Sequence, residues 1–230
     1  MYAFSVLTTP KPFQEYNLTF ITVTGNVLVT PSFNFTLHNK PALLLENGSR
    51  TTLVLDCSKN QYVELPDSGI PCIEDLDNCK KGFTFKMQLQ FTQIDTAEKT
   101  YILSSGGDVE TASGMAIYIQ SSQLIFGVKQ SFFHWSGKYD LTGKLNLSQW
   151  YKYEISWSYE KGISVIIDGY QVINEPQWTP SPGIAKTNPV LIGKTADSNT
   201  TSCMNVRDLF TWTIHREVLV DQGILPGDHM

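Results

Sequence analysis

Charged side chains are scarce in this chain of 230 residues, at 17% of the total, and the formal net charge is −5. No run of basic residues offsets that balance, which argues against a nucleic-acid partner or an anionic membrane surface. No apolar stretch reaches the ~20 residues of a membrane span, and residues 2–10 lack the features of a signal peptide. We therefore expect no nucleic-acid binding and no direct membrane insertion by this fragment, and we expect targeting and anchoring parts to belong to a longer protein.

Arrangements that carry catalysis are also missing. Glycoside hydrolysis needs two carboxylates held across one sugar, and neither a Glu-x-Asp-x-x-Glu nor a Glu-x-Asp-x-Glu spacing occurs. The 4 histidines are scattered, without a Gly-x-Ser-x-Gly elbow or a Cys-His signature. The acidic residues Glu74, Asp75 and Asp77 are expected to form a solvated turn. We predict that the chain is not an enzyme.

Strand-forming residues dominate what is present. Hydrophobic residues make up 41% and aromatic residues 12% of the chain, and Thr, Ser and Val are abundant, which favours strands over helices. Apolar and polar residues alternate cleanly over 83–91, which predicts a long central strand. Over 152–173, two alternating segments meet at a turn containing Gly162, and Asp168-Gly169 fits a two-residue type I′ hairpin.

Further strands are expected wherever alternating segments are bounded by Gly, Asn or Asp turns. They lie at 17–29 (a hairpin about Gly25-Asn26), 32–37, 42–45, 51–56, 61–65, 101–105, 115–120, 123–129, 131–135, 190–193 and 206–214, with a turn at Asn47-Gly48. Helix is expected only at 219–224, with a turn near 147–150. This spacing predicts an all-β fold, an antiparallel β-sandwich.

Five Asn-X-Ser/Thr sequons bear on the compartment. They begin at Asn17, Asn34, Asn47, Asn146 and Asn199. One sequon is nearly uninformative, but five, together with an even set of 4 cysteines, favour an oxidising environment. We expect a glycosylated protein of the secretory pathway, extracellular or at the cell surface, rather than a reduced cytosolic one.

Short motifs follow one another in a characteristic order. They include a Tyr-Val-x-Leu-Pro strand end, a Phe-Thr-Phe strand, a Gly-x-Ala-Ile-Tyr strand, a Trp-x6-Trp strand, an Ile-Asp-Gly hairpin and a Leu-Ile-Gly strand, and they lie at 62–66, 83–85, 114–118, 150–157, 167–169 and 191–193, ahead of a closing strand at 206–216. This order resembles the laminin G and pentraxin-like domains of the concanavalin A-like lectin/glucanase superfamily. The resemblance implies a jelly-roll sandwich over 37–226, with 1–36 as extra strands or a linker and 227–230 as a short appended tail.

The cysteines add to this resemblance. A short Cys72 to Cys79 loop before the Phe-Thr-Phe strand is similar to one in the pentraxin-like extracellular domain of adhesion-type receptors, and six intervening residues suit a local bridge. Cys57 and Cys203 then remain as a pair, and in the resembled fold their strands lie near each other. Four cysteines allow three pairings. Zinc is the alternative, but no Cys-x2-Cys occurs and no histidine is near a cysteine in sequence.

The resemblance also suggests a cofactor and a ligand site. Many laminin G and pentraxin domains bind calcium through rim loops, which makes Asp108 and Asp197 candidate ligands; the alternative is that they are ordinary polar loop residues. No other cofactor is expected. Trp178, in a Pro-rich loop, is either a contact residue for a ligand or part of the core. For residues 132–135, which carry three large rings, packing into the core is the preferred interpretation.

Fold analogy therefore carries the functional prediction. We expect an adhesion or recognition module of a larger receptor or matrix protein that binds an extracellular protein. A lectin-like glycan-binding domain is the first alternative, and a structural spacer or homo-oligomerisation module is the second.

Overall fold

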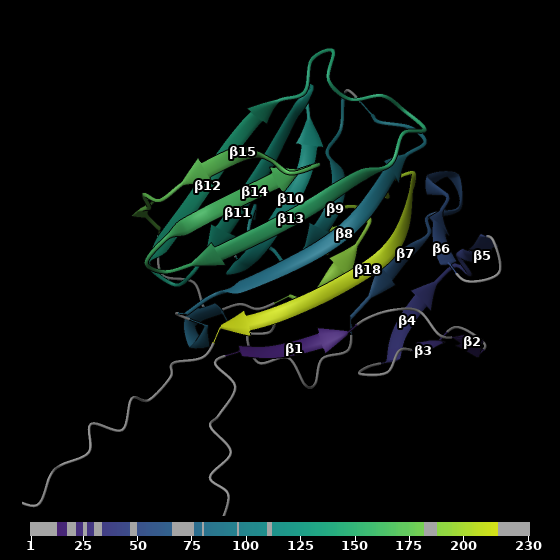
Figure 1. Ribbon diagram of the computed structural model, residues 1–230, viewed down its shortest axis with the longest axis horizontal. Helices are drawn as coiled ribbons and strands as arrows, with labels where there is room; N and C mark the ends of the chain where they lie inside the picture. The colour runs from purple at the N-terminus through teal and green to yellow at the C-terminus, as the bar shows by residue number, and fades with distance from the viewer. Residues whose placement is uncertain are drawn as a thin grey trace, which may run out of the picture.

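In the computed structural model, two antiparallel sheets form a β-sandwich (Figure 1). The structure describes residues 13–17, 22–24, 27–29, 34–46, 50–65, 76–79, 81–95, 97–109, 112–181 and 188–215. Within these ranges the only helical turns are two 3₁₀ helices, η1 (Cys57–Lys59) and η2 (Leu76–Asn78). None of the described helices is long and apolar enough to span a membrane. The predicted all-β class and sandwich architecture are confirmed.

The first sheet contains the strands with the clearest alternation. Its order is β15 (Tyr170–Glu175), β14 (Gly162–Ile167), β13 (Tyr151–Ser158), β8 (Phe83–Phe91), β18 (Met204–His215), β6 (Arg50–Leu55) and β5 (Ala42–Glu46), and β1 (Phe13–Asn17) also pairs with β18. As predicted, β8 is central. It lies between β13 and the long strand β18, drawn in yellow in Figure 1.

The second sheet faces the first. Its order is β16 (Thr179–Pro180), β12 (Phe133–Asp140), β11 (Gln123–Lys129), β10 (Gly114–Gln120), β9 (Thr100–Ser104), β17 (Leu191–Ile192), β7 (Tyr62–Glu64), β4 (Asn34–His38), β3 (Val27–Val29) and β2 (Thr22–Thr24). Strands from the first 36 residues thus belong to both sheets, β1 to the first and β2 and β3 to the second, where the predicted hairpin about residues 25–26 pairs Thr24 with Val27.

One hydrophobic core fills the space between the sheets. Every second residue of β8 is buried, from Phe83 to Phe91, and β13 buries the same face from Tyr151 to Trp157. Trp135 on β12 packs edge to face against Trp157 on β13, with ring centroids 5.4 Å apart, so the two sheets interlock through these indoles. An aromatic side chain of this kind buries about 150–250 Å², so the two indoles contribute strongly to the stability of the core.

The turns of the 152–173 segment form as predicted. Asp168 and Gly169 both have positive φ, at 50° and 86°, which is the signature of a type I′ turn. Gly162 has a φ of 69°, and a Cβ there would overlap the carbonyl oxygen of Glu175. Only glycine therefore fits at the start of β14.

Strand β12 differs from its prediction at both ends. It begins at Phe133 rather than at residue 131, because the amide of Gln130 donates to the carbonyl oxygen of Phe133 (2.8 Å) and makes residues 131 and 132 a hairpin tip. It continues to Asp140, through Gly137, whose added Cβ would overlap the side chain of Ile173 on β15. A glycine inside a strand weakens the alternating pattern that a sequence shows.

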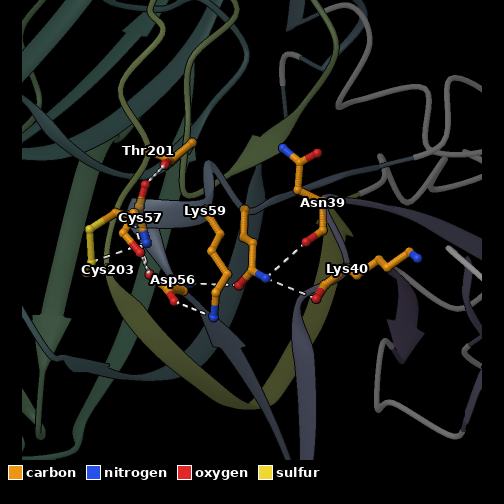
Figure 2. Close-up of polar contacts among 9 residues, drawn as sticks. Asn39, Lys40, Asp56, Cys57, Lys59, Thr201 and Cys203 are labelled. Atoms are coloured by element: carbon orange, nitrogen blue, oxygen red, sulfur yellow. Dashed lines mark hydrogen bonds and ion pairs between the residues drawn. A yellow bond between two sulfur atoms is a disulfide. The ribbon is translucent and has the colours of Figure 1, made fainter.

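A disulfide joins Cys57, the first residue of η1, to Cys203, the residue before β18 (Figure 2). This is the predicted pair, and it closes a sequence separation of 146 residues. Asp56 caps η1 through its bond to the amide of Ser58 (3.0 Å), and the Lys59 ammonium lies 2.8 Å from its carboxylate. Together the Lys59 and Ser58 hydrogen bonds lower the pKa of Asp56 to about 2.

The side chain of Gln61 connects the region around this disulfide to the turn between β4 and β5. Its Nε2 donates to the carbonyl oxygens of Asn39 and Lys40, at 3.0 Å each, and its Oε1 accepts from the amide of Asp56 (2.9 Å). Asn39 and Lys40 both have positive φ, so these bonds hold a tight turn between β4 and β5 (Figure 2). We call the region around Cys57, Gln61 and Cys203 the disulfide corner. It connects β4 of the second sheet to β5, β6 and β18 of the first.

Candidate functional site

Phe133, Tyr159 and Trp178 meet where β12, β16 and the β13–β14 turn lie together, and Phe132 directly precedes Phe133 in the chain. We call Phe132, Phe133, Tyr159 and Trp178 the aromatic end. Phe133 packs edge to face against Trp178, with centroids 4.6 Å apart, and against Tyr159, at 5.3 Å. Trp178 enters this group because the chain crosses here from β15 in the first sheet to β16 in the second.

The residues of the aromatic end differ in how much of their surface is exposed to solvent. Phe132 is 65% exposed and Trp178 is 45% exposed, whereas Phe133 is half-buried. The expected core role for residues 132–135 is therefore correct for Trp135, which is fully buried, and wrong for Phe132. Phe132 lies in the hairpin tip, outside the alternation of β12, and most of it is exposed to solvent.

The hairpin tip that carries Phe132 is held from two sides. On one side, Gln130 donates from Nε2 to the carbonyl oxygen of Leu76 (2.5 Å), and the Ser131 hydroxyl donates to the carboxylate of Asp77. On the other side, the amide of Ser181 donates to the carbonyl oxygen of Phe132 (3.0 Å). Asp77 is exposed, as expected for a solvated turn, but it also anchors the tip, which the sequence does not indicate.

The remaining cysteine prediction is only partly within the described chain. Cys79, at the end of η2, is buried and disulfide-bonded. Its predicted partner Cys72 lies outside the described residues, as do Glu74, Asp75, the Asn47-Gly48 turn, the helix at 219–224 and the tail at 227–230.

Asp108 occupies a different place, in the loop that follows β9. Its carboxylate accepts from the Lys99 ammonium (2.8 Å) and from the Tyr101 hydroxyl (2.6 Å), and its side chain is 5% exposed. Burial, reinforced by the hydrogen bond to Asp108, raises the pKa of Tyr101, so this hydroxyl stays protonated and donates. The Lys99 ammonium also lies 4.6 Å from the centre of the Tyr118 ring.

The calcium prediction fits these residues poorly. Asp197 is exposed in its loop and lies close enough to raise the pKa of Tyr101 slightly, whereas Asp108 already holds a lysine ammonium. Across the described ranges, no group of three or more His, Cys, Asp or Glu side chains is arranged to hold a metal ion. Calcium needs six to eight oxygen ligands.

Two sequons have described side chains, and both are exposed. Asn146 lies in the loop before β13, where the amide of Ser148 donates to the carbonyl oxygen of Phe91 (2.9 Å). Asn199 lies just before the disulfide corner, near Thr201, whose hydroxyl donates to the carbonyl oxygen of Cys57. Both belong to the Phe91 end of β8, whereas the aromatic end lies beyond the Phe83 end. For Asn17 and Asn34 only the backbone is described, and Asn47 lies outside the described ranges.

Among the comparisons with known proteins, only the one with solved structures finds similar proteins. No protein-family model and no curated protein sequence matches the chain. Similar solved structures include the binding domain of botulinum neurotoxin DC with rat synaptotagmin II, which has a TM-score of 0.58 at 13% identity over 87% of this chain and 48% of that one. The same domain in complex with SialylT has a TM-score of 0.56 at 13% identity, covering 83% and 45%.

A botulinum neurotoxin type C structure, whose cell entry is described as dependent on two ganglioside molecules, has a TM-score of 0.56 at 16% identity, covering 87% of this chain and 48% of that one. The chain therefore spans about half the length of these toxin domains. At identities this low, the similarity shows only that the chain shares the all-β fold of these toxin structures.

Proposed function

We propose that this chain is an extracellular, glycosylated recognition domain of the laminin G and pentraxin-like type, part of a larger receptor or matrix protein, and that it binds a protein ligand through its aromatic end. The observation that carries the proposal is the pair of exposed rings, Phe132 and Trp178, on segments fixed by hydrogen bonds and by the Phe133 contact. Aromatic side chains at the centre of an interface supply most of its binding energy.

The positions of the described sequons support this choice of surface. Among the sequons with described side chains, glycans on Asn146 and Asn199 would lie at the Phe91 end of the sandwich, away from the aromatic end. Rigid presentation supports it too, because the tip loses little conformational freedom when a ligand orders it.

A glycan ligand is the second candidate. The similar toxin domains are described with gangliosides and SialylT as well as with synaptotagmin, and an exposed indole can stack on a sugar ring. Glu175 and Gln177 precede Trp178 in the chain, and the Glu175 carboxylate accepts from the amide of Gln177 (3.1 Å), so polar groups adjoin the indole in sequence.

The test is a screen of the secreted, glycosylated chain against a library of extracellular proteins and a glycan array. Phe132→Ala and Trp178→Ala should each lower the affinity for any ligand found by at least tenfold. Tyr170→Ala is the matched control, since Tyr170 is 78% exposed on the β14–β15 hairpin, at the end of β14 away from the aromatic end. Equal loss in all three variants, or loss in none, would reject the aromatic end as the ligand site.

A further inference from the structure

The loop after β9 folds onto the second sheet. The amides of Ser105 and Gly107 donate to the carbonyl oxygen of Met115 on β10, at 2.7 and 3.2 Å. A Cβ at Gly107 would lie 2.6 Å from the Cα of Met115, so the backbone of the loop touches the strand. This close contact brings the next residue, Asp108, over the tyrosines of β9 and β10.

A carboxylate as buried as that of Asp108 needs a compensating charge. The Lys99 ammonium provides this charge, 2.8 Å from the Asp108 carboxylate. The same ammonium also lies over the Tyr118 ring, which attracts it. Tyr101 and Tyr118 are buried in a small apolar cluster with Ala116 and Ile125, separate from the main core. The cation is therefore held by a rigid aromatic support.

A second lysine secures the same loop. The ammonium of Lys129, on the neighbouring strand β11, donates to the carbonyl oxygen of Val109 (3.0 Å), one residue beyond Asp108. Two lysines from different segments thus bind consecutive acceptors of one loop. This is the task that a bound cation performs in rim loops built from carboxylates and carbonyl oxygens.

We infer that Lys99 is a built-in replacement for a metal ion at this loop, so the fold of the loop is independent of calcium. The calcium expected from the family resemblance does not fit, because its best candidate ligand is already neutralised and a divalent ion beside the ammonium would be repelled. This inference concerns a region away from the aromatic end and does not depend on the proposed function.

The two carboxylate oxygens of Asp108 differ in their hydrogen bonding. Asp108 Oδ1 is buried and has no hydrogen-bond partner in the described structure, while Oδ2 receives both Lys99 and Tyr101. In Lys99→Met the carboxylate would keep only the tyrosine hydroxyl and would be left as a buried, uncompensated anion. Such a site should gain affinity for a divalent cation.

The experiment measures Tm of the intact chain in EDTA and in millimolar CaCl2, with NaCl of matched ionic strength as the salt control. The wild-type Tm should be the same in both. Lys99→Met should lower Tm by roughly 5 °C or more in EDTA, and CaCl2 should restore part of the loss. The double variant Lys99→Met/Asp108→Asn, which removes both charges, should fold without calcium and show no response.

Two results would overturn the inference. One is a calcium-induced rise in the wild-type Tm that Asp108→Asn abolishes, because calcium would then bind beside Lys99. The other is a Lys99→Met variant that is destabilised but does not respond to calcium. If Lys99→Met does not fold in EDTA, refolding with and without CaCl2 decides the same question, and the double variant shows whether the loop can fold once both charges are gone.

Discussion

The indole of Trp178 meets the phenyl ring of Phe133 edge to face, at an interplanar angle of 77° and with ring centroids 4.6 Å apart. Phe133 belongs to β12, and Trp178 belongs to the segment that carries the chain between the sheets. The contact therefore fixes an exposed tryptophan on a half-buried support, and it gives Trp178 both a structural and a surface role.

Trp178→Ala should destabilise the protein only modestly. The lost aromatic pair is worth about 0.5–1.5 kcal/mol beyond its buried area, and nearly half of the residue is in solvent. Trp135→Ala, which empties a fully buried site, should cost about 3–5 kcal/mol. Urea denaturation measures both; a loss for Trp178→Ala as large as that for Trp135→Ala would assign Trp178 to the core.

Removing the Cys57–Cys203 disulfide with Cys57→Ala/Cys203→Ala should cost about 2–5 kcal/mol, because the bridge closes a long loop and restricts the unfolded chain. Guanidinium denaturation under non-reducing conditions measures the loss. Gln61→Ala is a useful companion, since it removes the side-chain bonds of the same corner and leaves the bridge intact. An unchanged midpoint in the double variant would show that the noncovalent contacts of the corner suffice.

Gly162→Ala should destabilise the protein much more than Gly169→Ala. Both positions have positive φ, so both pay for a strained backbone, at about 1 kcal/mol or more. Only at Gly162 does the new methyl group also overlap a neighbouring carbonyl oxygen; nothing described lies within 4 Å at Gly169. Thermal unfolding measures the loss of stability in each variant. Equal losses would mean that β14 and β15 move apart to accommodate the methyl group without losing stability.

Stability should fall as the pH drops below about 6.5, in part through His134. Burial, aided by the nearby charge of Lys129, lowers the pKa of His134 below its ordinary value of 6.5. Below pH 6.5 the unfolded chain takes up a proton at His134 more readily than the folded chain does. The stabilising contribution of the neutral imidazole is therefore complete above the unfolded pKa and is lost as the pH falls toward the lower pKa of the folded state.

His134→Gln should flatten this part of the stability profile. Urea midpoints at pH 7.5 and 5.5 for both proteins measure the effect, and an NMR titration of the imidazole gives the pKa directly. Hydrogen bonds lower the pKa values of Asp56 and Asp140. These carboxyl groups therefore titrate in more acidic solution and do not interfere with the measurement. An imidazole pKa of His134 at or above 6.5 would contradict the prediction.

The sequence was most informative where one face of a strand is buried. β8 and β13 alternate with period two because each has one face in the core and the other in solvent. The same logic missed the extent of β12, since Gly137 carries no side chain to continue the alternation. β16 was missed altogether, because two residues are too few to show a period.

The candidate site was less predictable, because its contacts join distant segments. Trp178 could be selected from its Pro-rich surroundings, but its partner Phe133 becomes evident only when β12 and β16 pair. Asp77 and Ser131 are 54 residues apart in sequence, and nothing local to either one indicates the other. Lys99 lies only nine residues from Asp108, but the ion pair depends on how the loop returns over β10.

The position of β18 beside β8 affects how the chain acquires its structure. Asn205 and Gln90, adjacent across these strands, are 115 residues apart in sequence, so the centre of the first sheet cannot close until the chain has been synthesised through Asn205. Until then, the edge of β8 that β18 will cover is open to other strands. Domains with such nonlocal pairing fold slowly and are prone to aggregate on the way. Efficient production of this domain should therefore depend on chaperones that shield the unfinished sheet.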